Sequence, residues 1–162
     1  MKTEVLFSSR TEEWGTPQWL FEKVNAVFNF QLDVCATPEN AKCKRFYTIE
    51  DNGLLKPWAK TNWMNPPYGR DIAKWMKKAS MESSRGNTTV CLVPARTDTA
   101  WWHDYIENNP LVFVIFIRGR LKYEGAKNNA PFPSSICFFW GGYPADEIGI
   151  AYRTIRRGVN FR

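Results

Sequence analysis

The stretch TNWMNPPYG, residues 61–69, changes character at its midpoint. Its first half predicts a β-strand, but a strand inside a sheet cannot continue through two prolines, which lack the backbone N–H. We therefore expect the strand to end in a loop that begins at Asn65. The next segments are DIAKWMKKASMESS, residues 71–84, with apolar residues at helical spacing, and TTVCLVPAR, residues 88–96, with the apolar run of a strand covered on both faces. Strand, loop, helix and strand in succession favour an α/β fold with a mainly parallel sheet.

The segments before this stretch continue the alternation. PQWLFEKVNAVF, residues 17–28, predicts a helix with Thr16 as its N-cap and Pro17 at its first position. FQLDVCAT, residues 30–37, and RFYTI, residues 45–49, are candidate short strands. The first third of the chain is therefore expected to add one helix and two strands to the same fold.

The last third has a different character. Residues 100–107 predict a helix, and LVFVIFIRGRLKYE, residues 111–124, predicts one long strand or two short ones. A loop at 125–135 and a last strand, SICFFW at 135–140, follow without an intervening helix. Successive strands of this kind predict an antiparallel C-terminal edge of the sheet.

Composition indicates one domain. The 162 residues contain no repeat or linker, so we expect a single domain over residues 1–162, with a core at about 14–140 and a basic tail at about 141–162. The net charge of +6, from 22 basic and 16 acidic side chains, suits a nucleic-acid partner without requiring one. No signal peptide or membrane span is predicted, and the four cysteines are too scattered for a zinc site or a disulfide framework. We expect a soluble, cytoplasmic protein with reduced thiols and no metal.

The loop Asn65-Pro66-Pro67-Tyr68 is the candidate for catalysis. It follows a predicted strand, and open α/β sheets bind ligands beyond the carboxyl ends of their strands. An exocyclic amine on an aromatic ring is a poor nucleophile, so its methylation needs acceptors that draw the nitrogen lone pair out of conjugation. The Asn65 side-chain carbonyl and the Pro66 backbone carbonyl suit the two amine hydrogens, and the rigid prolines would hold them still. Tyr68 would stack on a flipped-out base. The alternative is that NPPYG is only a turn.

These residues belong to a longer series of blocks. It begins with WGTPQWLF at 14–21 and continues through LDVCAT, NAK, FYT, DNGL, WMNPPYG, LVPARTDT, WWH, RGRLKY and APFPSS to about residue 140. On these blocks the chain resembles the phage-type DNA adenine-N6 methyltransferases of the Dam kind. The resemblance implies a Rossmann-like, S-adenosylmethionine-dependent methyltransferase fold, encoded by a phage and acting in the host cell on a flipped adenine in double-stranded DNA. It implies that the catalytic residues are Asn65, Pro66, Pro67 and Tyr68.

The cofactor site is marked less sharply. Many methyltransferases have a glycine-rich turn after the first strand, and LDVCAT at 32–37 stands there instead. The resemblance implies that the pocket for S-adenosylmethionine, which leaves as S-adenosylhomocysteine, is lined by Thr16, Pro17, Asp33, Ala36, Asp51 and Asn52. Asp33 would contact the amino group of the methionine moiety, and Asp51 and Asn52 the ribose or the adenine. The alternative for Asp33 is a strand-end carboxylate that caps a neighbouring loop.

Basic residues in the second half are the candidates for DNA contact. Arg118, Arg120 and Lys122 alternate along a predicted strand, so their side chains would share one face and form a stripe for phosphates. Lys127 lies in the long loop, and Arg96 would shape the wall of the base pocket. A second basic cluster lies at the C-terminus, and an ordinary solvated surface is the alternative for both clusters.

Two other functions stay open at this level. The same fold and motif would suit another amine or amide, in cytosine, RNA guanine or protein glutamine, and a catalytically silent relative would only bind DNA or cofactor. The intact NPPY motif argues against a silent protein, and the basic balance favours DNA. Little of the chain is left to read a DNA sequence, so recognition should be short or relaxed, or should need a second subunit. The choice between monomer and homodimer stays open.

Overall fold

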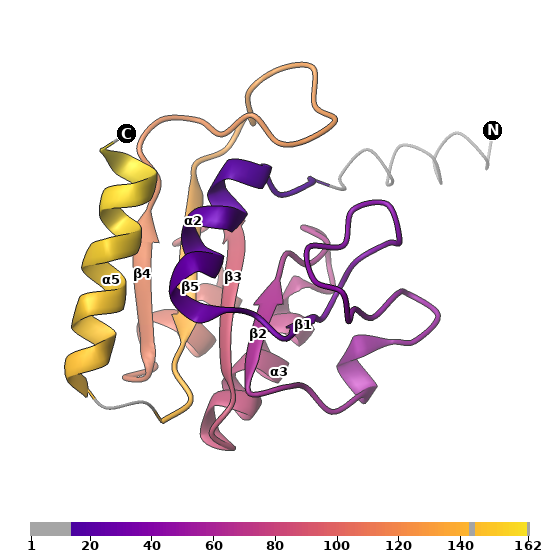
Figure 1. Cartoon of the computed structure of the whole chain (residues 1–162), viewed down its shortest axis with the longest axis vertical. Helices are drawn as coiled ribbons and strands as arrows, with labels where there is room; N and C mark the ends of the chain where they lie inside the picture. Colours follow the sequence, from indigo (N-terminus) through magenta and orange to yellow (C-terminus); the bar gives the residue numbers. More distant parts are fainter. Residues whose placement is uncertain (1–13, 143–144, 162) are drawn as a thin grey trace.

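The computed structural model describes residues 14–142 and 145–161 (Figure 1). Its centre is a five-stranded sheet with the strand order β1-β2-β3-β5-β4. The strands are β1 (Leu32–Asp33), β2 (Thr61–Met64), β3 (Thr88–Pro94), β4 (Val112–Phe116) and β5 (Ser134–Phe139). Every residue of β2, β3 and β5 is buried, as expected of central strands that are covered on both faces.

Helices cover both faces of the sheet. They are α2 (Gln18–Phe28), the 3-10 turn η2 (Gly53–Leu55), α3 (Ile72–Ser84), α4 (Ala100–Trp102), the π-helical turn η3 (His103–Glu107) and α5 (Ala145–Asn160). In the view of Figure 1, α2 and α5 contact each other in front of the sheet, and α3 lies behind it in contact with α4 and η3. The fold is therefore three layers with the apolar core between them. None of the described helices is both long and apolar enough to cross a membrane.

The sheet is mixed. β1, β2 and β3 pair in parallel, whereas β5 pairs antiparallel with both β3 and β4. Antiparallel pairing at the C-terminal edge was expected, and the two strands at that edge, β5 and β4, pair antiparallel. β5 returns into the space between β3 and β4, and β4 forms the edge, running in the same direction as the first three strands.

Three local predictions also need correction. Residues 45–49 do not form a strand, because only Phe46 makes a bridge, to Asp33. The helix expected at 100–107 is divided into α4 and the π-helical turn η3. The strand expected at 111–124 stops at the end of β4, and residues 117–133, here called the long loop, carry no regular strand.

The start of α2 is held differently from the prediction. Pro17, not Thr16, occupies the N-cap position, and the helix begins at Gln18. The Gln18 backbone N–H donates to Oε1 of Glu124, a residue of the long loop, at 3.1 Å. A carboxylate from elsewhere in the chain thus takes the position at the helix N-terminus, and the Thr16 hydroxyl is left for another partner.

The segment expected as a basic tail contains the helix α5. Ile155 and Val159 are buried in the core, and α5 packs against α2 and β4. At its end, the Asn160 side chain accepts from the Arg118 backbone N–H (2.8 Å) and donates to the Phe116 carbonyl (3.0 Å). These bonds fix the base of the long loop to the C-terminus of the helix.

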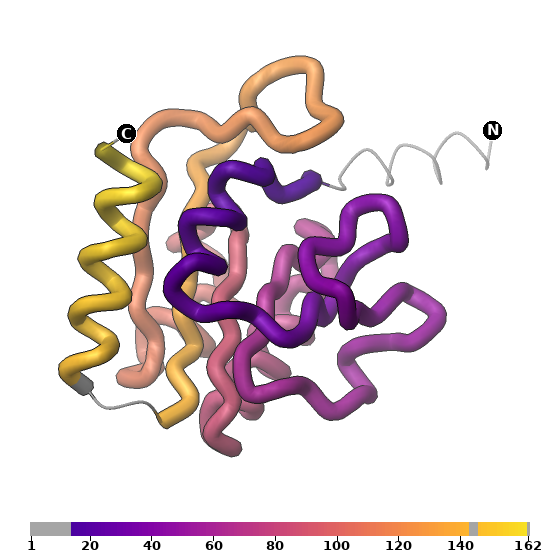
Figure 2. The backbone as a smooth tube through the Cα atoms, viewed as in Figure 1, coloured from indigo at the N-terminus to yellow at the C-terminus, as the bar shows by residue number. Residues whose placement is uncertain are grey.

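β1, β2, β3 and β4 run in the same direction, so their carboxyl ends lie at one end of the sheet, here called the carboxyl edge. The loops that leave this edge are residues 34–60, 65–71, 95–99 and 117–133. Figure 2 shows the long loop, in orange, reaching beyond the sheet above the first described residues, in indigo. A bridge between Gly15 and Glu124 joins the two segments. Any ligand held at this edge is therefore surrounded by loops from four parts of the sequence.

Candidate active site

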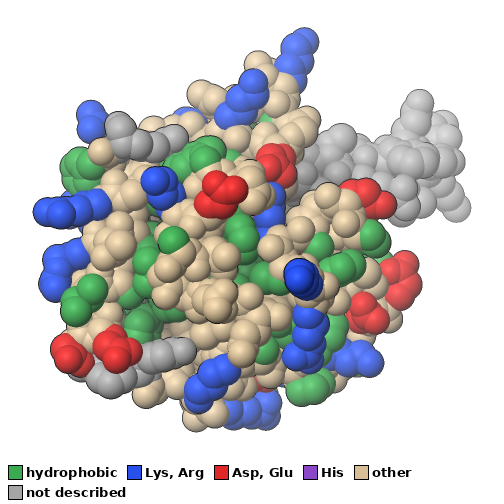
Figure 3. All heavy atoms as spheres, viewed as in Figure 1, with side chains coloured by type: hydrophobic (Ala, Val, Ile, Leu, Met, Phe, Trp, Pro, Cys, Tyr) green, Lys and Arg blue, Asp and Glu red, His purple; other side chains and the backbone are tan. Residues whose placement is uncertain are grey.

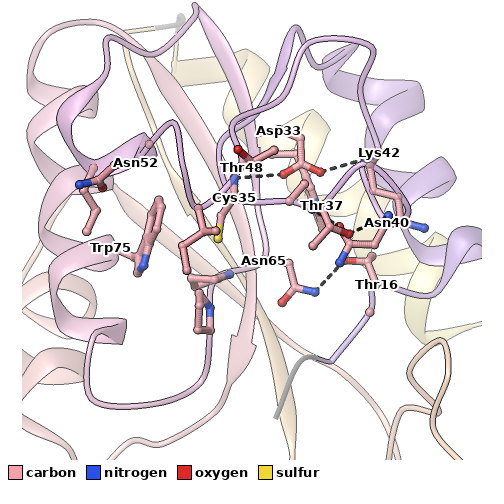
Figure 4. A pocket seen from close by; sticks show the side chains of 18 of the residues that line it. Thr16, Asp33, Cys35, Thr37, Asn40, Lys42, Thr48, Asn52, Asn65 and Trp75 are labelled. Atoms are coloured by element: carbon pink, nitrogen blue, oxygen red, sulfur yellow. Dashed lines mark hydrogen bonds between the residues drawn. The ribbon is translucent and has the colours of Figure 1, made fainter. Parts of the chain in front are cut away.

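A cavity of about 770 Å³ opens beyond the carboxyl ends of β1 and β2. Its walls come from residues within 14–16, 33–42, 48–54, 63–67 and 71–75. Figure 4 shows that the side chains of Asp33, Asn65 and Thr16, which come from different elements, lie around the same space. The carboxyl edge of the parallel strands thus holds a cavity of the size that small-molecule cofactors occupy.

Some of the predicted cofactor and catalytic residues line the cavity, and the others lie behind its wall. The cavity is lined by Thr16, Asp33, Ala36, Asn52, Asn65, Pro66 and Pro67, but not by Pro17, Asp51 or Tyr68. Pro17 is buried at the start of α2. The Asp51 carboxylate accepts from the backbone N–H and the hydroxyl of Thr48 at 2.8 and 3.0 Å, and these bonds lower its pKa. Asp51 therefore closes the turn that brings Asn52 to the cavity.

Asp33 is the buried carboxylate of the site. It is 3% exposed and accepts from the backbone N–H groups of Cys35 (3.3 Å) and Lys42 (3.0 Å). Burial nevertheless raises the pKa of Asp33 to about 6, because the desolvation cost exceeds what these bonds recover. The expected loop-capping role is present, and the carboxylate also lines the cavity. A cation placed in the cavity would stabilise the ionised form.

Several lining residues were not foreseen from the sequence. Thr37 and Asn40 close a turn, since each side chain accepts the backbone N–H of the other, at 3.2 and 2.7 Å. Trp75 stacks on Trp58 with 6.5 Å between ring centroids, and Ile49 is 88% exposed beside the cavity. The spacing Thr-x-x-Asn signals such a turn, whereas nothing local distinguishes the other side chains from core or surface residues.

The Asn65 amide is fixed from three sides. Its Nδ2 donates to the backbone carbonyl of Trp14 and to Oγ1 of Thr16 (3.0 Å), and its Oδ1 accepts from the Tyr68 hydroxyl at 2.6 Å. Both amide hydrogens are therefore used, and the oxygen keeps one lone pair. The side chain lines the cavity, so this lone pair is the acceptor available to a substrate group.

Tyr68 is placed differently from the expectation that its ring stacks on a base. It is 4% exposed, and its ring makes edge contacts with Tyr123 and Phe132 at centroid distances of 6.2 and 5.8 Å. Its hydroxyl reaches the Leu92 carbonyl at 2.9 Å as well as Asn65. Burial raises the pKa of Tyr68 well above its usual value, so the hydroxyl stays protonated as a donor. In this arrangement the tyrosine holds the asparagine, and stacking on a base would require its neighbours to move.

Comparison with known families decides the identity. The family model described as DNA N-6-adenine-methyltransferase (Dam) matches residues 3–157. The chain belongs to this family. As a Dam-family protein it is a methyltransferase, and its reaction is methylation of adenine at N6 in DNA.

Individual relatives agree with the family assignment. The Dam-family chain is 32% identical over 127 residues, 73% of each chain, to a protein of Haemophilus phage HP1 named DNA N-6-adenine-methyltransferase. A protein of Escherichia phage T1 with the same name is 35% identical over 99 residues, 59% of this chain and 41% of the relative. A putative methyltransferase of Escherichia coli K12, YfdM, is 37% identical over 65 residues, 35% of this chain and 71% of the relative. Two of these relatives are phage proteins, as the resemblance implied.

The predicted DNA-binding residues of the Dam-family chain lie outside the cavity. Arg118, Arg120, Lys122 and Lys127 are exposed on the long loop, and Arg96 is exposed after β3. Leu121 and Tyr123 are buried on either side of the exposed Lys122, so buried and exposed side chains alternate although the segment is not a strand. In Figure 3, Lys and Arg side chains project from the upper and left margins of the molecule, over the long loop and α5. Of the C-terminal arginines, Arg153, Arg156 and Arg157 are exposed on α5, and Arg162 lies outside the described residues.

The buried hydroxyl of Tyr68 gives a first prediction. Tyr68→Phe is expected to lower kcat about 10-fold, because it removes the donor to Asn65 and leaves the Leu92 carbonyl without this partner, a loss worth about 1–3 kcal/mol. Single-turnover methyl transfer measures the effect, with Tyr152→Phe, a half-buried tyrosine of α5, as the control. A rate equal to that of the unmodified protein would show that the ring alone matters.

Proposed function

We propose that the cavity holds S-adenosylmethionine within a Rossmann-like fold and that Asn65 orients an adenine amine flipped out of duplex DNA. The observation that carries the proposal is the Asn65 amide, which three hydrogen bonds fix at the cavity wall with one carbonyl lone pair left over. Both ligands would meet at this group. The NPPY residues are then a site with a defined donor and acceptor arrangement and not only a turn.

The donor set of the cavity fits the proposed cofactor. When bound, S-adenosylmethionine supplies a methyl group activated by the positive charge on its sulfur. Asp33 would bind the cationic amino group, because its carboxylate is buried at the cavity wall and accepts hydrogen bonds there from two backbone N–H groups. Asn52 would form a hydrogen bond with the ribose, as donor or as acceptor. The exposed Ile49 would offer an apolar surface to the adenine ring. Pro17 and Asp51 would act indirectly, by holding the walls.

The chain's own groups would act on the amine as follows. The free lone pair of Asn65 Oδ1 and the backbone carbonyl of Pro66 accept one amine hydrogen each, so the nitrogen lone pair is no longer held in the ring system. Pro67 keeps the loop rigid, and Tyr68 prevents the Asn65 amide from rotating. These acceptors are in place before the reaction, and little reorganisation is needed.

Double-stranded DNA would lie across the carboxyl edge of the sheet. Arg96 and the four cations of the long loop lie at this edge, where they can neutralise phosphates on either side of a flipped base. Much of the affinity would come from these charges. The salt dependence of binding should therefore be steep.

The basic residues give a second prediction. Lys122→Ala or Arg120→Ala should weaken binding about equally on duplexes of different sequence and lower the slope of log affinity against log salt by about one. Fluorescence anisotropy at several salt concentrations measures both quantities. The matched control is Lys60→Ala, an exposed lysine that precedes β2 at the opposite edge. Unchanged affinity and slope in both loop variants would make the loop cations ordinary surface.

Two assays test the proposed function as a whole. Isothermal titration should show one site for S-adenosylhomocysteine, and Lys122→Ala should leave it intact. Labelled S-adenosylmethionine, offered with duplex DNA, single-stranded DNA, RNA and protein, should label duplex DNA fastest. Preferential labelling of another acceptor would overturn the assignment of the substrate.

A further inference from the structure

Glu124 occupies an unusual position in the long loop. It is the only acidic residue between 117 and 133, among four basic ones, and it directly follows the segment Arg118–Tyr123. Its side chain is 46% exposed, yet its atoms reach two other segments of the chain. Both of these segments line the cavity.

The first connection runs to the beginning of α2. The Glu124 backbone N–H donates to the Gly15 carbonyl at 2.9 Å, and its Oε1 accepts from the Gln18 N–H at 3.1 Å. A Cβ at Gly15 would lie 3.1 Å from the Cβ of Glu124, which is closer than most side-chain contacts, so the two backbones approach closely here. The residues on either side of Gly15, Trp14 and Thr16, are those that hold the Asn65 amide. Glu124 therefore bonds to the residue that lies between two of the hydrogen-bond partners of Asn65.

The second connection runs to the cofactor side of the cavity. Oε2 of Glu124 lies 3.2 Å from Nζ of Lys42, which also donates to Oε1 of Gln18 at 2.9 Å. The Lys42 side chain is only 8% exposed, and its backbone N–H is one of the two donors to Asp33. A buried lysine needs its acceptors, because losing them leaves a charge away from water. Glu124 therefore also holds the loop that positions the Asp33 carboxylate.

We infer that Glu124 is a positioning residue that couples the DNA-facing loop to the cofactor pocket and to Asn65. The inference rests on the proposed function, since it takes the cavity as the cofactor site and the long loop as a DNA contact. Cofactor bound against Asp33 and Lys42 would restrain Glu124 and with it the neighbouring Arg120 and Lys122. DNA bound to those cations would restrain the same contacts, which join Glu124 to Gly15, Gln18 and Lys42. Each ligand then binds more tightly when the other is present.

A thermodynamic cycle tests this coupling. The affinity for a labelled duplex is measured by anisotropy without and with saturating S-adenosylhomocysteine, and the affinity for S-adenosylhomocysteine by calorimetry without and with duplex. The full chain should show a coupling of about fivefold or more, equal in both directions. In Glu124→Ala the coupling should fall below about twofold, although each ligand still binds alone. Glu124→Gln keeps an acceptor for Gln18 but loses the charge beside Lys42, so its coupling should be intermediate.

The control and the contradicting results separate this inference from the proposed function. Glu147→Ala removes an exposed carboxylate on α5 and should keep the full coupling. If Glu124→Ala is not folded by circular dichroism, Glu124→Gln decides the question. Undiminished coupling in the folded Glu124 variants, or no coupling in the unmodified protein, would overturn the inference and leave the proposed function standing. Failure of the unmodified protein to bind S-adenosylhomocysteine or duplex would overturn both.

Discussion

Replacement of Asn65 by alanine is expected to lower methyl transfer to DNA by about 100- to 1000-fold, the loss typical when one hydrogen-bonding group at a transition state is removed. The loss should lie in kcat, because this acceptor acts on the amine as the methyl group moves. The affinity for S-adenosylhomocysteine should change by less than about twofold, since the cofactor is assigned to Asp33 and its neighbours. Single-turnover transfer and calorimetry measure the two quantities separately.

A matched asparagine provides the control for this experiment. Asn108, at the end of the π-helical turn, is exposed and lies outside the cavity, so Asn108→Ala should have the activity of the unmodified protein. An Asn65→Ala protein that keeps more than about a tenth of the activity would contradict the role of the amide.

Asp33→Asn is expected to weaken cofactor binding about 10- to 150-fold, the value of a hydrogen bond to a charged group of about 1.5–3 kcal/mol. The substitution keeps the shape of the side chain but removes the charge that is proposed to face the cofactor amine. Calorimetric titration with S-adenosylhomocysteine gives the affinity, and thermal unfolding shows whether the loop after β1 is intact. Equal affinity in a folded Asp33→Asn protein would remove Asp33 from the cofactor site.

The raised pKa of Asp33 predicts how binding depends on pH. In the free protein this pKa is about 6, and a bound cation would lower it, so binding below pH 6 must release a proton. Cofactor affinity should therefore fall about tenfold for each pH unit below 6 and be flat just above it. Asp33→Asn should abolish this dependence. A slope that persists in the variant would place the titrating group elsewhere.

The same pKa has the opposite consequence for stability without cofactor. The folded protein binds the Asp33 proton more tightly than the unfolded chain, whose carboxyl has a pKa of 3.8. Its contribution to the free energy of unfolding is therefore greatest below pH 4 and is lost as the pH rises through 6. Asp33→Asn should remove this part of the pH dependence, which urea titrations at several pH values would show.

Local patterns were sufficient for the elements on either side of the loop proposed as catalytic. The prolines after Met64 and the helical spacing from Ile72 predicted the end of β2 and the start of α3 closely, because both depend on adjacent residues. The alternation of basic and apolar residues at 120–123 led to the wrong prediction that the strand continues to residue 124. Leu121 and Tyr123 are buried because the loop covers the core, and this produces a strand-like period without a partner strand.

Long-range contacts account for what could not be predicted. Thr16 has the sequence context of an N-cap, but Glu124, 106 residues after Gln18, supplies the acceptor at that helix end. The Thr16 hydroxyl then becomes a partner of Asn65. Tyr68 is an aromatic residue in a loop, which suggests stacking on a base. Only the packing of Tyr123 and Phe132 around its ring reveals that its hydroxyl is the group that contacts Asn65. Such exchanges of partners leave no signal in a short window of sequence.

The most direct measurement is the identity of the methylated nucleoside. Duplex DNA is incubated with the protein and labelled S-adenosylmethionine, digested to nucleosides and separated by liquid chromatography with mass detection. All the label is predicted in N6-methyldeoxyadenosine, with about a hundredth of it or less in the Asn65→Ala reaction over the same time. Label in a cytosine product, or a duplex that carries no label, would contradict adenine methylation by this site.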